Sequence, residues 1–468
     1  MKILKIIIPN FQQFRDFELD LTHPDTGETL EKVCFIGSNG TGKSTLLNIL
    51  NTFLKFLKAG QYEFNWKLDS IISFELDGKM YYCSIFNGKI VGLYEVQKLK
   101  EARQDIEFID TFKNSIKTKG ARKIDIKTKI PVYQEYDLFM DKYKFFSIDL
   151  STSGKDLHYP NRQKIKIGDV IYSPAESIQN NLLAIDDVPK TNVDEALNVN
   201  KNKSYYIVSN ETVTDFWTQL IALIKEREGD LKTFAQENKK KTYEEIEAEF
   251  DKDNPEILKE IAAFWNKILD KSNLYFDYEN AKNPIQLLDN LQAYIKNKHT
   301  HEIIPYNALS TGIRNFMFRL GHIYSLYFNK TIDSGFLLVD EPENSLFPDF
   351  LYDLIDIYLD IIKDKNTQFF VATHNPIIAA QFEPFERVIL RFDESGFVQA
   401  HRGQSPVGDD PNDLLENDFE VRNLMPRQGR EAFKQYQDLR RQLRELIDDS
   451  DKEGLMTKIS ILGQKYNF

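Results

Sequence analysis

The stretch Gly37-Ser38-Asn39-Gly40-Thr41-Gly42-Lys43-Ser44 decides the fold of this chain. It follows the apolar run 33–36 (VCFI) and precedes the helical pattern 45–50 (TLLNIL). A glycine loop between a strand and a helix is the context of a P-loop, in which backbone N–H groups converge on phosphate oxygens and the helix N-terminus adds positive potential. The sequence therefore predicts a nucleotide-phosphate site at this loop.

The residue types in this loop suit the chemistry of a triphosphate. Lys43 is placed to reach the β- and γ-phosphates, and the hydroxyl of Ser44 is a hard oxygen ligand for Mg²⁺. The glycines permit backbone conformations that a Cβ would penalise. The nucleotide-binding residues that we predict here are Ser38, Asn39, Gly40, Thr41, Gly42, Lys43, Ser44 and Thr45.

Length and composition indicate a globular protein with more than one domain. The chain has 468 residues, of which 41% are hydrophobic and 28% are charged. Its formal net charge of -12 restricts any nucleic-acid contact to a local patch. No apolar run approaches the roughly 20 residues of a membrane span, so we expect no membrane partner. The two cysteines, Cys34 and Cys83, exclude a disulfide framework and a zinc cluster and fit a reducing cytoplasm.

The order of strand-like and helical segments divides the chain into four parts. We predict an N-terminal head segment at 1–187, a helical insertion at 188–299, a C-terminal head segment at 300–402 and a helical tail at 403–468. The uniform apolar runs 336–339 and 369–372 suit central parallel strands, and a helix is predicted between them at 349–362. This βαβ unit returns the chain to the P-loop domain.

Two carboxylates follow an apolar strand far downstream of the P-loop, in the run 337–342 (LLVDEP). Asp340 can hold Mg²⁺ through water, and Glu341 can orient or deprotonate an attacking water. A strand that ends in Asp-Glu is a weak signal alone, but behind a P-loop it becomes specific. The combination predicts a hydrolytic nucleotide site.

A histidine follows the next apolar strand, in the run Thr373-His374-Asn375-Pro376. Ligands of open α/β sheets bind at the carboxyl ends of the strands, which places His374 to contact the γ-phosphate and sense its loss. The alternative is a histidine that only caps the next helix. We favour the phosphate role because the other elements of the site accompany it.

The segment 309–315 (LSTGIRN) precedes a helix and has the features of an anion site. Ser310 offers a hydroxyl, Gly312 offers a bare backbone N–H, and the helix N-terminus offers its positive end. Taken alone, the same segment is an ordinary helix cap.

The ordered set of these motifs resembles the ABC-type ATPases of the RecF, SMC and OLD group. The matching motifs are Walker A at 37–44, an LSGGQ-like signature at 309–314, Walker B at 337–341, a D-loop at 342–348 and a switch histidine at 374. The segment 341–348 (EPENSLFP) is similar to a Glu-Pro-Glu-x-x-Leu-x-Pro motif of bacterial OLD-like and defence-associated ATPases. The insertion and the tail are covered by no motif.

The resemblance implies an α/β fold with a P-loop ABC-type head, made of a mixed sheet and an antiparallel β-layer, to which the helical insertion and tail are added. It implies head-to-head dimerisation, in which ATP in one P-loop is capped by Ser310 and Gly312 of the other head. The implied catalytic residues are Lys43, Glu341 and His374, and the implied cofactors are ATP and Mg²⁺, with the metal at Ser44 and Asp340. Gln179 and Glu176 are alternative candidates for the Q-loop.

The tail extends the resemblance to a biological role. The segment 408–415 (GDDPNDLL) and the paired helices after it are similar to tails of stand-alone ATPases, some encoded beside nucleases in anti-phage systems of the Septu, retron or PARIS type. We expect a cytoplasmic ATPase that regulates a nuclease or other effector supplied in trans. The alternatives are a RecF-like DNA repair ATPase, with DNA as its partner, and a scaffold that binds ATP without turnover. The intact Asp340-Glu341 pair argues against the scaffold.

The tail also carries a basic face. Two interpretations are equally consistent with the sequence: the face binds a partner nuclease, or it is simply solvated. Its members are Arg427, Arg430, Lys434, Arg440, Arg441 and Arg444.

Overall fold

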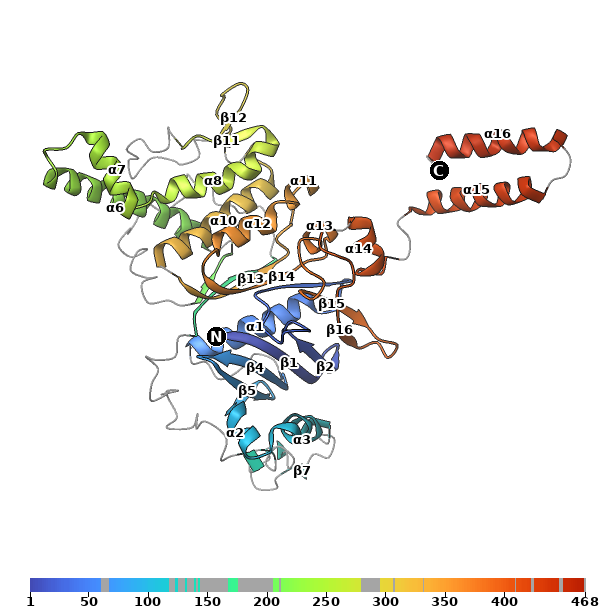
Figure 1. Cartoon of the computed structure of the whole chain (residues 1–468), viewed down its shortest axis with the longest axis horizontal. Helices are drawn as coiled ribbons and strands as arrows, with labels where there is room; N and C mark the ends of the chain where they lie inside the picture. Colours follow the sequence, from blue (N-terminus) through green and yellow to red (C-terminus); the bar gives the residue numbers. More distant parts are fainter. Residues whose placement is uncertain are drawn as a thin grey trace.

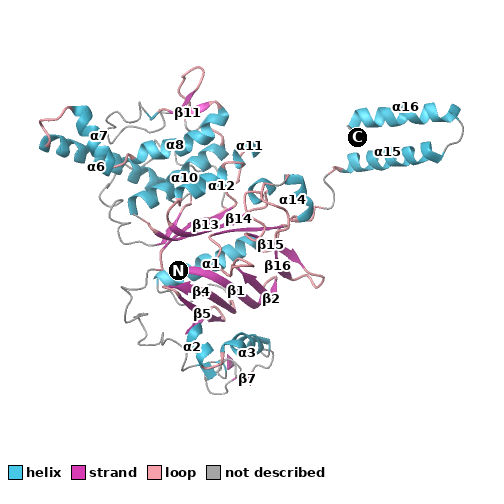
Figure 2. Cartoon of the chain, in the orientation of Figure 1, coloured by secondary structure: helices cyan, strands magenta, loops and turns pink. Residues whose placement is uncertain are grey.

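A computed structural model describes most of the chain. The described residues are 1–59, 67–117, 123–124, 131–132, 139, 142–143, 167–175, 205–209, 212–278, 295–305, 308–330, 332–408, 410–421, 425–445 and 449–466. The candidate Q-loop residues Gln179 and Glu176 lie outside them. Figures 1 and 2 show a central sheet with a group of helices above it, a second group of strands below it, and a helical hairpin to one side.

Twelve of the described strands form one mixed sheet. Its parallel half runs in the order β10 (Tyr205–Ile207), β9 (Asp169–Ser173), β13 (Ser334–Asp340), β14 (Asn366–Ala372), β3 (Lys32–Gly37) and β15 (Arg387–Phe392). The mainly antiparallel half continues with β16 (Val398–Arg402), β2 (Phe14–Asp20), β1 (Lys2–Phe11), β4 (Ser70–Leu76), β5 (Lys79–Phe86) and β6 (Lys89–Glu95). The predicted α/β class, with a mixed sheet and an antiparallel β-layer, is confirmed.

Two short pairs of strands lie outside this sheet: β11 (Leu274–Phe276) with β12 (Ile295–Asn297), and β7 (Lys123–Ile124) with β8 (Pro131–Val132). The described helices before the signature are α1 (Lys43–Ala59), α2 (Val96–Glu101), α3 (Asp105–Lys117), α6 (Val213–Glu237), α7 (Tyr243–Asp253), α8 (Ile257–Leu269) and the 3₁₀ turn η5 (Asp270–Ser272). Those after it are α10 (Thr311–Lys330), α11 (Pro348–Leu351), α12 (Leu354–Ile361), α13 (Pro376–Ala379), α14 (Pro411–Asn417), α15 (Arg427–Glu445) and α16 (Asp449–Tyr466). None of these helices combines the length and the apolar character needed to cross a bilayer.

The central parallel strands β3, β13 and β14 contain unbroken apolar runs because both of their faces are covered. In β3, Val33 and Phe35 join the core that contains α1, while Cys34 and Ile36 join the core on the opposite face with α8, α10 and α12. Side chains alternate between the faces of a strand, so two covered faces require an unbroken apolar run. The same alternation holds from 336 to 339 in β13.

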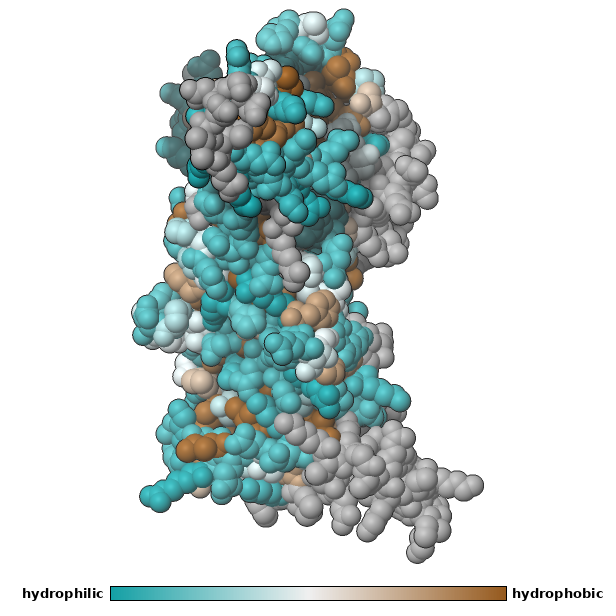
Figure 3. Space-filling model, turned by 90° about the vertical axis from the view of Figure 1, so that its right-hand side faces the viewer, coloured by the Kyte–Doolittle hydropathy of each residue, from teal (hydrophilic) through white to brown (hydrophobic). Residues whose placement is uncertain are grey.

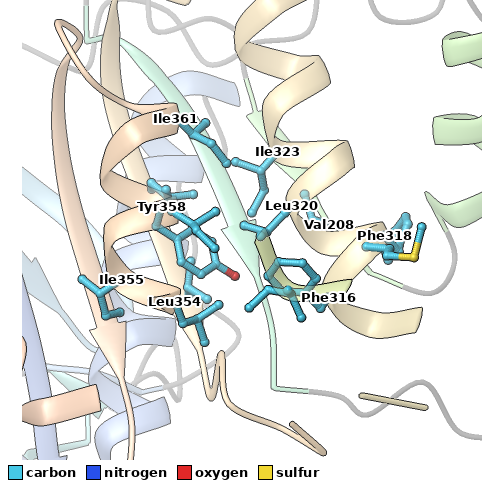
Figure 4. Close-up of a cluster of buried hydrophobic side chains, with 14 of the residues drawn as sticks. Val208, Phe316, Phe318, Leu320, Ile323, Leu354, Ile355, Tyr358 and Ile361 are labelled. Carbon is cyan, nitrogen blue, oxygen red and sulfur yellow. The ribbon is translucent and has the colours of Figure 1, made fainter. Parts of the chain in front are cut away.

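Helices α10 and α12 pack against each other through large apolar side chains (Figure 4). Phe316, Leu320 and Ile323 of α10 belong to one buried cluster with residues of α12 that include Leu354, Tyr358 and Ile361. Burial of each such side chain contributes roughly 1.5–3 kcal/mol. This packing fixes α10, whose N-terminus carries the signature segment.

The helix predicted at 349–362 is interrupted in the structure. Helix α11 ends at Leu351 and α12 begins at Leu354. In a continuous helix, the carbonyl of Asp349 would accept the N–H of Asp353. Here Lys271 donates to that carbonyl at 2.7 Å and pairs with the Asp353 carboxylate at 2.6 Å. A side chain from η5 therefore takes the place of a helical hydrogen bond.

The segment 403–421 packs on the head. The side chain of Leu414 is buried in the core beside α13, and the N–H of Gly408 donates to the carbonyl of Ala380 at 2.9 Å. Asp418 pairs with Arg387 of β15 at 3.3 Å, and both side chains are fully buried. Helix α14 is thus bound to the head.

Helices α15 and α16 pack on each other as a hairpin that lies apart from the rest of the chain in Figure 1. Figure 3 shows that the molecular face on this side is largely hydrophilic, with hydrophobic side chains in small separate patches.

Candidate functional site

The P-loop connects β3 to α1, which begins at Lys43 directly after Gly42. The ammonium of Lys43 donates to the carbonyl of Gly37 at 2.8 Å and to the carbonyl of Ser38 at 3.3 Å. Burial lowers the pKa of Lys43, an effect that nearby carboxylates, Glu341 first among them, oppose. The lysine is therefore folded over its own loop, with its charge next to the acidic end of β13.

The other predicted loop residues surround this lysine. Ser38, Asn39 and Gly40 are exposed, whereas Thr41 is buried and its hydroxyl donates to the carbonyl of Ser38 at 2.8 Å. Thr45 lies half-buried in the first turn of α1. The exposed residues leave backbone groups of the loop accessible to a ligand.

Gln13 of the turn between β1 and β2, and Phe14 at the start of β2, lie against the P-loop, a contact that our sequence analysis missed. A Cβ at Gly42 would lie 2.3 Å from Nε2 of Gln13 and 2.5 Å from Cζ of Phe14, and the φ of Gly42 is +92°. Only glycine fits there, both because of this space and because of the left-handed backbone. Arg15, the next residue of β2, lies over the ring of Phe397 at 5.0 Å.

Ser44 and Asp340 meet although they are far apart in the sequence. The hydroxyl of Ser44 donates to Oδ1 of Asp340 at 3.2 Å. Burial raises the pKa of Asp340 to about 6, and the hydrogen bond from Ser44 only partly opposes this. Two hard oxygens in a buried position fit Mg²⁺, which usually takes one or two carboxylates together with substrate phosphates. A cation there would compensate the buried charge.

Glu341 and His374 are brought together at the ends of neighbouring parallel strands. Asp340 is opposite Ala372 in the register of β13 and β14, and the N–H of Glu341 donates to the carbonyl of Ala372 at 2.8 Å. Nδ1 of His374 lies 3.3 Å from Oε1 of Glu341, and both side chains remain partly exposed. Glu341 has a φ of +44°, which is strained for a residue with a Cβ.

The alternative role of His374, as a helix cap, is performed by its neighbour. The side chain of Asn375 accepts the N–H of Ile377 at 2.9 Å and caps α13. The imidazole is therefore free of the capping role and lies beside Glu341.

The signature segment is joined to the D-loop of the same chain. Ser310 is exposed, and its hydroxyl accepts the N–H of Ile313 at 3.3 Å, so it is a helix cap, as its sequence alone suggested. A Cβ at Gly312 would lie 1.9 Å from the carbonyl oxygen of Ser345. The structure thus places Gly312, two residues after Ser310, against the D-loop.

Arg319 of α10 connects the elements of the site, and our sequence analysis missed it. Its Nη1 donates to the carbonyl of Glu341 at 3.2 Å and to that of Asp340 at 3.4 Å, and its Nη2 donates to the carbonyl of Pro174. The signal was present in the sequence, because Arg319 lies three residues after Phe316, on the apolar face of its helix. A buried arginine on such a face needs several acceptors.

Comparison of the sequence with models of protein families identifies the family of the chain. A family model described as an AAA ATPase domain matches residues 1–379. The chain belongs to this AAA ATPase family. The match includes the P-loop, the acidic end of β13 and His374, and the protein is accordingly a nucleotide-binding ATPase.

Similar solved structures include three SMC head domains. One is the SMC head bound to the C-terminal winged-helix domain of ScpA (12% identity, TM-score 0.36, 86% of this chain and 97% of that chain). A second is the SMC head domain from Thermotoga maritima (13%, 0.36, 86% and 100%). A third is an SMC head with an extended coiled coil, bound to the C-terminal domain of ScpA derived from Pyrococcus furiosus (13%, 0.34, 90% and 100%). A comparison of the ATPase with curated proteins gave no match.

Proposed function

We propose that this ATPase hydrolyses ATP between two heads of the ABC type, and that its cycle controls a nuclease or other effector supplied in trans in defence against phage. The observation that carries the hydrolytic part is the pair formed by Glu341 and His374, 3.3 Å apart, beside the contact between Ser44 and Asp340. In this arrangement Glu341 is a base for water and His374 is its partner, and Ser44 and Asp340 beside them offer two oxygens that suit a metal.

The catalytic roles follow from these positions. Lys43 leaves the carbonyls of its own loop and binds the β- and γ-phosphates, while the loop N–H groups hold the remaining phosphate oxygens. Glu341 accepts a proton from a water molecule as the water oxygen attacks the γ-phosphorus in line, and ADP leaves with the electrons of the broken P–O bond. His374 orients the Glu341 carboxylate and contacts the γ-phosphate.

Ser44 and Asp340 would hold Mg²⁺. When it is bound, Mg²⁺ neutralises charge on the β- and γ-phosphate oxygens. The raised pKa of Asp340 supports this assignment, because a cation would favour the ionised carboxylate that burial disfavours.

The dimeric part rests on the signature. Ser310 is exposed at the positive end of α10, where its hydroxyl and the backbone N–H groups suit the γ-phosphate of a second chain. A two-fold axis would place each signature on the partner's P-loop. Each nucleotide would then be bound by one chain and capped by the other.

The effector part rests on the tail and on one motif. Six basic residues of α15, from Arg427 to Arg444, are exposed on a hairpin that packs mainly on itself, which suits a docking element. The resemblance of residues 341–348 to defence-associated ATPases supports the anti-phage role.

Two variants with complementary defects test the shared sites. Lys43→Ala removes the P-loop lysine, and Ser310→Arg blocks the cap, so each protein alone should be inactive. Mixing them in equal amounts should restore about a quarter of wild-type phosphate release, because half of the dimers are mixed and each holds one intact site. A mixture that stays inactive, while each variant remains folded, would refute the shared site.

Glu341→Gln tests the base. This variant should bind ATP, form a stable dimer in size-exclusion chromatography with light scattering, and release almost no phosphate. A wild-type rate of phosphate release in Glu341→Gln would show that Glu341 is not the base. The defence role is tested by counting phage plaques on cells that carry the ATPase gene and its neighbouring reading frame. It fails if cells with wild-type protein and cells with Glu341→Gln give equal counts.

A further inference from the structure

The D-loop contains a buried carboxylate, Glu343, that takes no part in the steps above. The residue is 6% exposed. Its Oε1 accepts hydrogen bonds from the hydroxyl of Thr373 and, at 3.3 Å, from the backbone N–H of His374. Its Oε2 has no hydrogen-bond partner among the described residues. A half-satisfied buried carboxylate costs stability, so its presence calls for a functional explanation.

The contacts of Glu343 reach the catalytic pair in two steps. Its carboxylate accepts the hydroxyl of Thr373 and the backbone N–H of His374, and Nδ1 of the same histidine lies 3.3 Å from Oε1 of Glu341. The histidine side chain is half exposed. Its direction therefore depends on how firmly its backbone is fixed.

The backbone of Glu343 belongs to the turn that touches the signature. Its carbonyl accepts the N–H of Leu346 at 2.9 Å, which closes a turn around Ser345. The carbonyl of Ser345 fills the space where Gly312 lacks a Cβ. Movement of the signature against the D-loop would therefore act on Glu343.

We propose that Glu343 is a positioning residue, which holds the backbone of His374 so that its imidazole stays against Glu341, and which links that placement to the D-loop segment on Gly312. The inference rests on the proposed role of His374. Burial raises the pKa of Glu343, while its bonds to Thr373 and the nearby His374 oppose this. Oε1 can accept the two hydrogen bonds in either protonation state, so the acceptor geometry matters more than the charge.

Glu343→Ala removes the acceptor and should lower kcat for ATP about tenfold or more, with KM changed less than about twofold, because the effect falls on the transition state. Glu343→Gln keeps an oxygen acceptor and should recover at least about a third of the lost turnover. Thr373→Val removes one donor with little change of shape and should lower kcat in the same direction, which covers the case in which Glu343→Ala does not fold. Wild-type kcat in Glu343→Ala or Thr373→Val would overturn the proposal.

Glu386→Ala is the matched control. Glu386 is 8% exposed, pairs with Lys32 at 3.2 Å and directly precedes β15, at the end of the sheet away from the P-loop. It should lower the melting temperature as Glu343→Ala does, with kcat retained. A similar loss of kcat in both variants would mean that Glu343 is only a stabilising residue, and would overturn its positioning role.

The double variant Glu343→Ala with His374→Ala separates this inference from the proposed function. If Glu343 acts through His374, the double variant should be no slower than His374→Ala alone. If the loss of kcat in the double variant equals the product of the losses in the two single variants, Glu343 does not act through His374, while the proposed role of His374 stands. A wild-type kcat in His374→Ala would instead refute the proposed role of the histidine itself.

Discussion

Replacement of Gly312 by alanine would place a methyl group inside the D-loop. An ideal Cβ at this position lies 1.9 Å from the carbonyl oxygen of Ser345 and 2.6 Å from its carbonyl carbon. Real Cβ atoms essentially never approach a heavy atom closer than 3.0 Å, so α10 and the D-loop must separate by 3.0 minus 1.9, or about 1 Å. The clash is with backbone, which no side-chain rotation relieves.

The displacement would reach Glu341 and His374, the proposed catalytic residues, because the D-loop is bonded to them. The N–H of Asn344 donates to the carbonyl of Glu341 at 3.2 Å, and Glu343 holds the backbone of His374. A misplacement of 1 Å at catalytic groups can cost on the order of 10²-fold in rate. We therefore expect Gly312→Ala to lower kcat by about two orders of magnitude, and to cost roughly 1–3 kcal/mol of stability through overpacking.

The measurement is steady-state phosphate release together with a thermal melt. Gly321→Ala is the matched control, because Gly321 lies on the same helix and a Cβ there would lie 2.9 Å from ring atoms of Phe216 and Trp265. It should cost similar stability and retain turnover, since the neighbours are side chains of the core. The reasoning is refuted if Gly312→Ala hydrolyses ATP at the wild-type rate, or if both variants lose activity equally.

Two further predictions concern buried charges. Asp418→Ala removes the carboxylate that pairs with the buried Arg387, and should lower the free energy of unfolding in urea by about 3–5 kcal/mol. Asp360→Ala, the control, breaks the exposed pair with Lys267 and should cost about 0–1 kcal/mol. Equal costs would contradict the buried ion pair that joins the end of α14 to β15. Burial raises the pKa of Asp340 from 3.8 to about 6. Between these two pH values the metal-free folded protein keeps a proton on Asp340 that the unfolded chain has released, so the stability of the folded protein falls as the pH rises from about 4 to about 6. Asp340→Asn should therefore raise the melting temperature of the metal-free protein above pH 6 but not below pH 4, and an unchanged value at pH 7.5 would contradict this.

The parts of the fold that follow local rules could be predicted from the sequence. Uniform apolar runs announced β3, β13 and β14, and the P-loop pattern required a strand before it and a helix after it. Because carboxyl ends of parallel strands share one edge of a sheet, the residues just after β13 and β14 could be expected to meet there. Glu341 and His374 do lie side by side at that edge.

The rest depends on contacts between distant segments, which no local pattern encodes. Arg319 reaches the carbonyl of Pro174, 145 residues away, and Gln368 bonds both backbone groups of Ile3, 365 residues away. The break between α11 and α12 depends in the same way on Lys271, from another helical segment. Such positions show in the sequence only as polar residues within apolar surroundings, and the partners that satisfy them become visible only in the fold.

Backbone strain at Glu341 and in the D-loop is the reason why these distant contacts would matter for the proposed catalysis. Glu341 and Ser345 both have left-handed backbones, with φ of +44° and +65°, which cost about 1–3 kcal/mol each for residues with side chains. Such conformations persist only where the surroundings over-determine them. Here Gly312 confines the loop on one side, and the amide of Asn344 donates to the carbonyl of Ala175 on another at 2.8 Å. Because each contact of this loop fixes the next, a second chain that presses on the signature would displace Glu341, the carboxylate that we propose orients the attacking water.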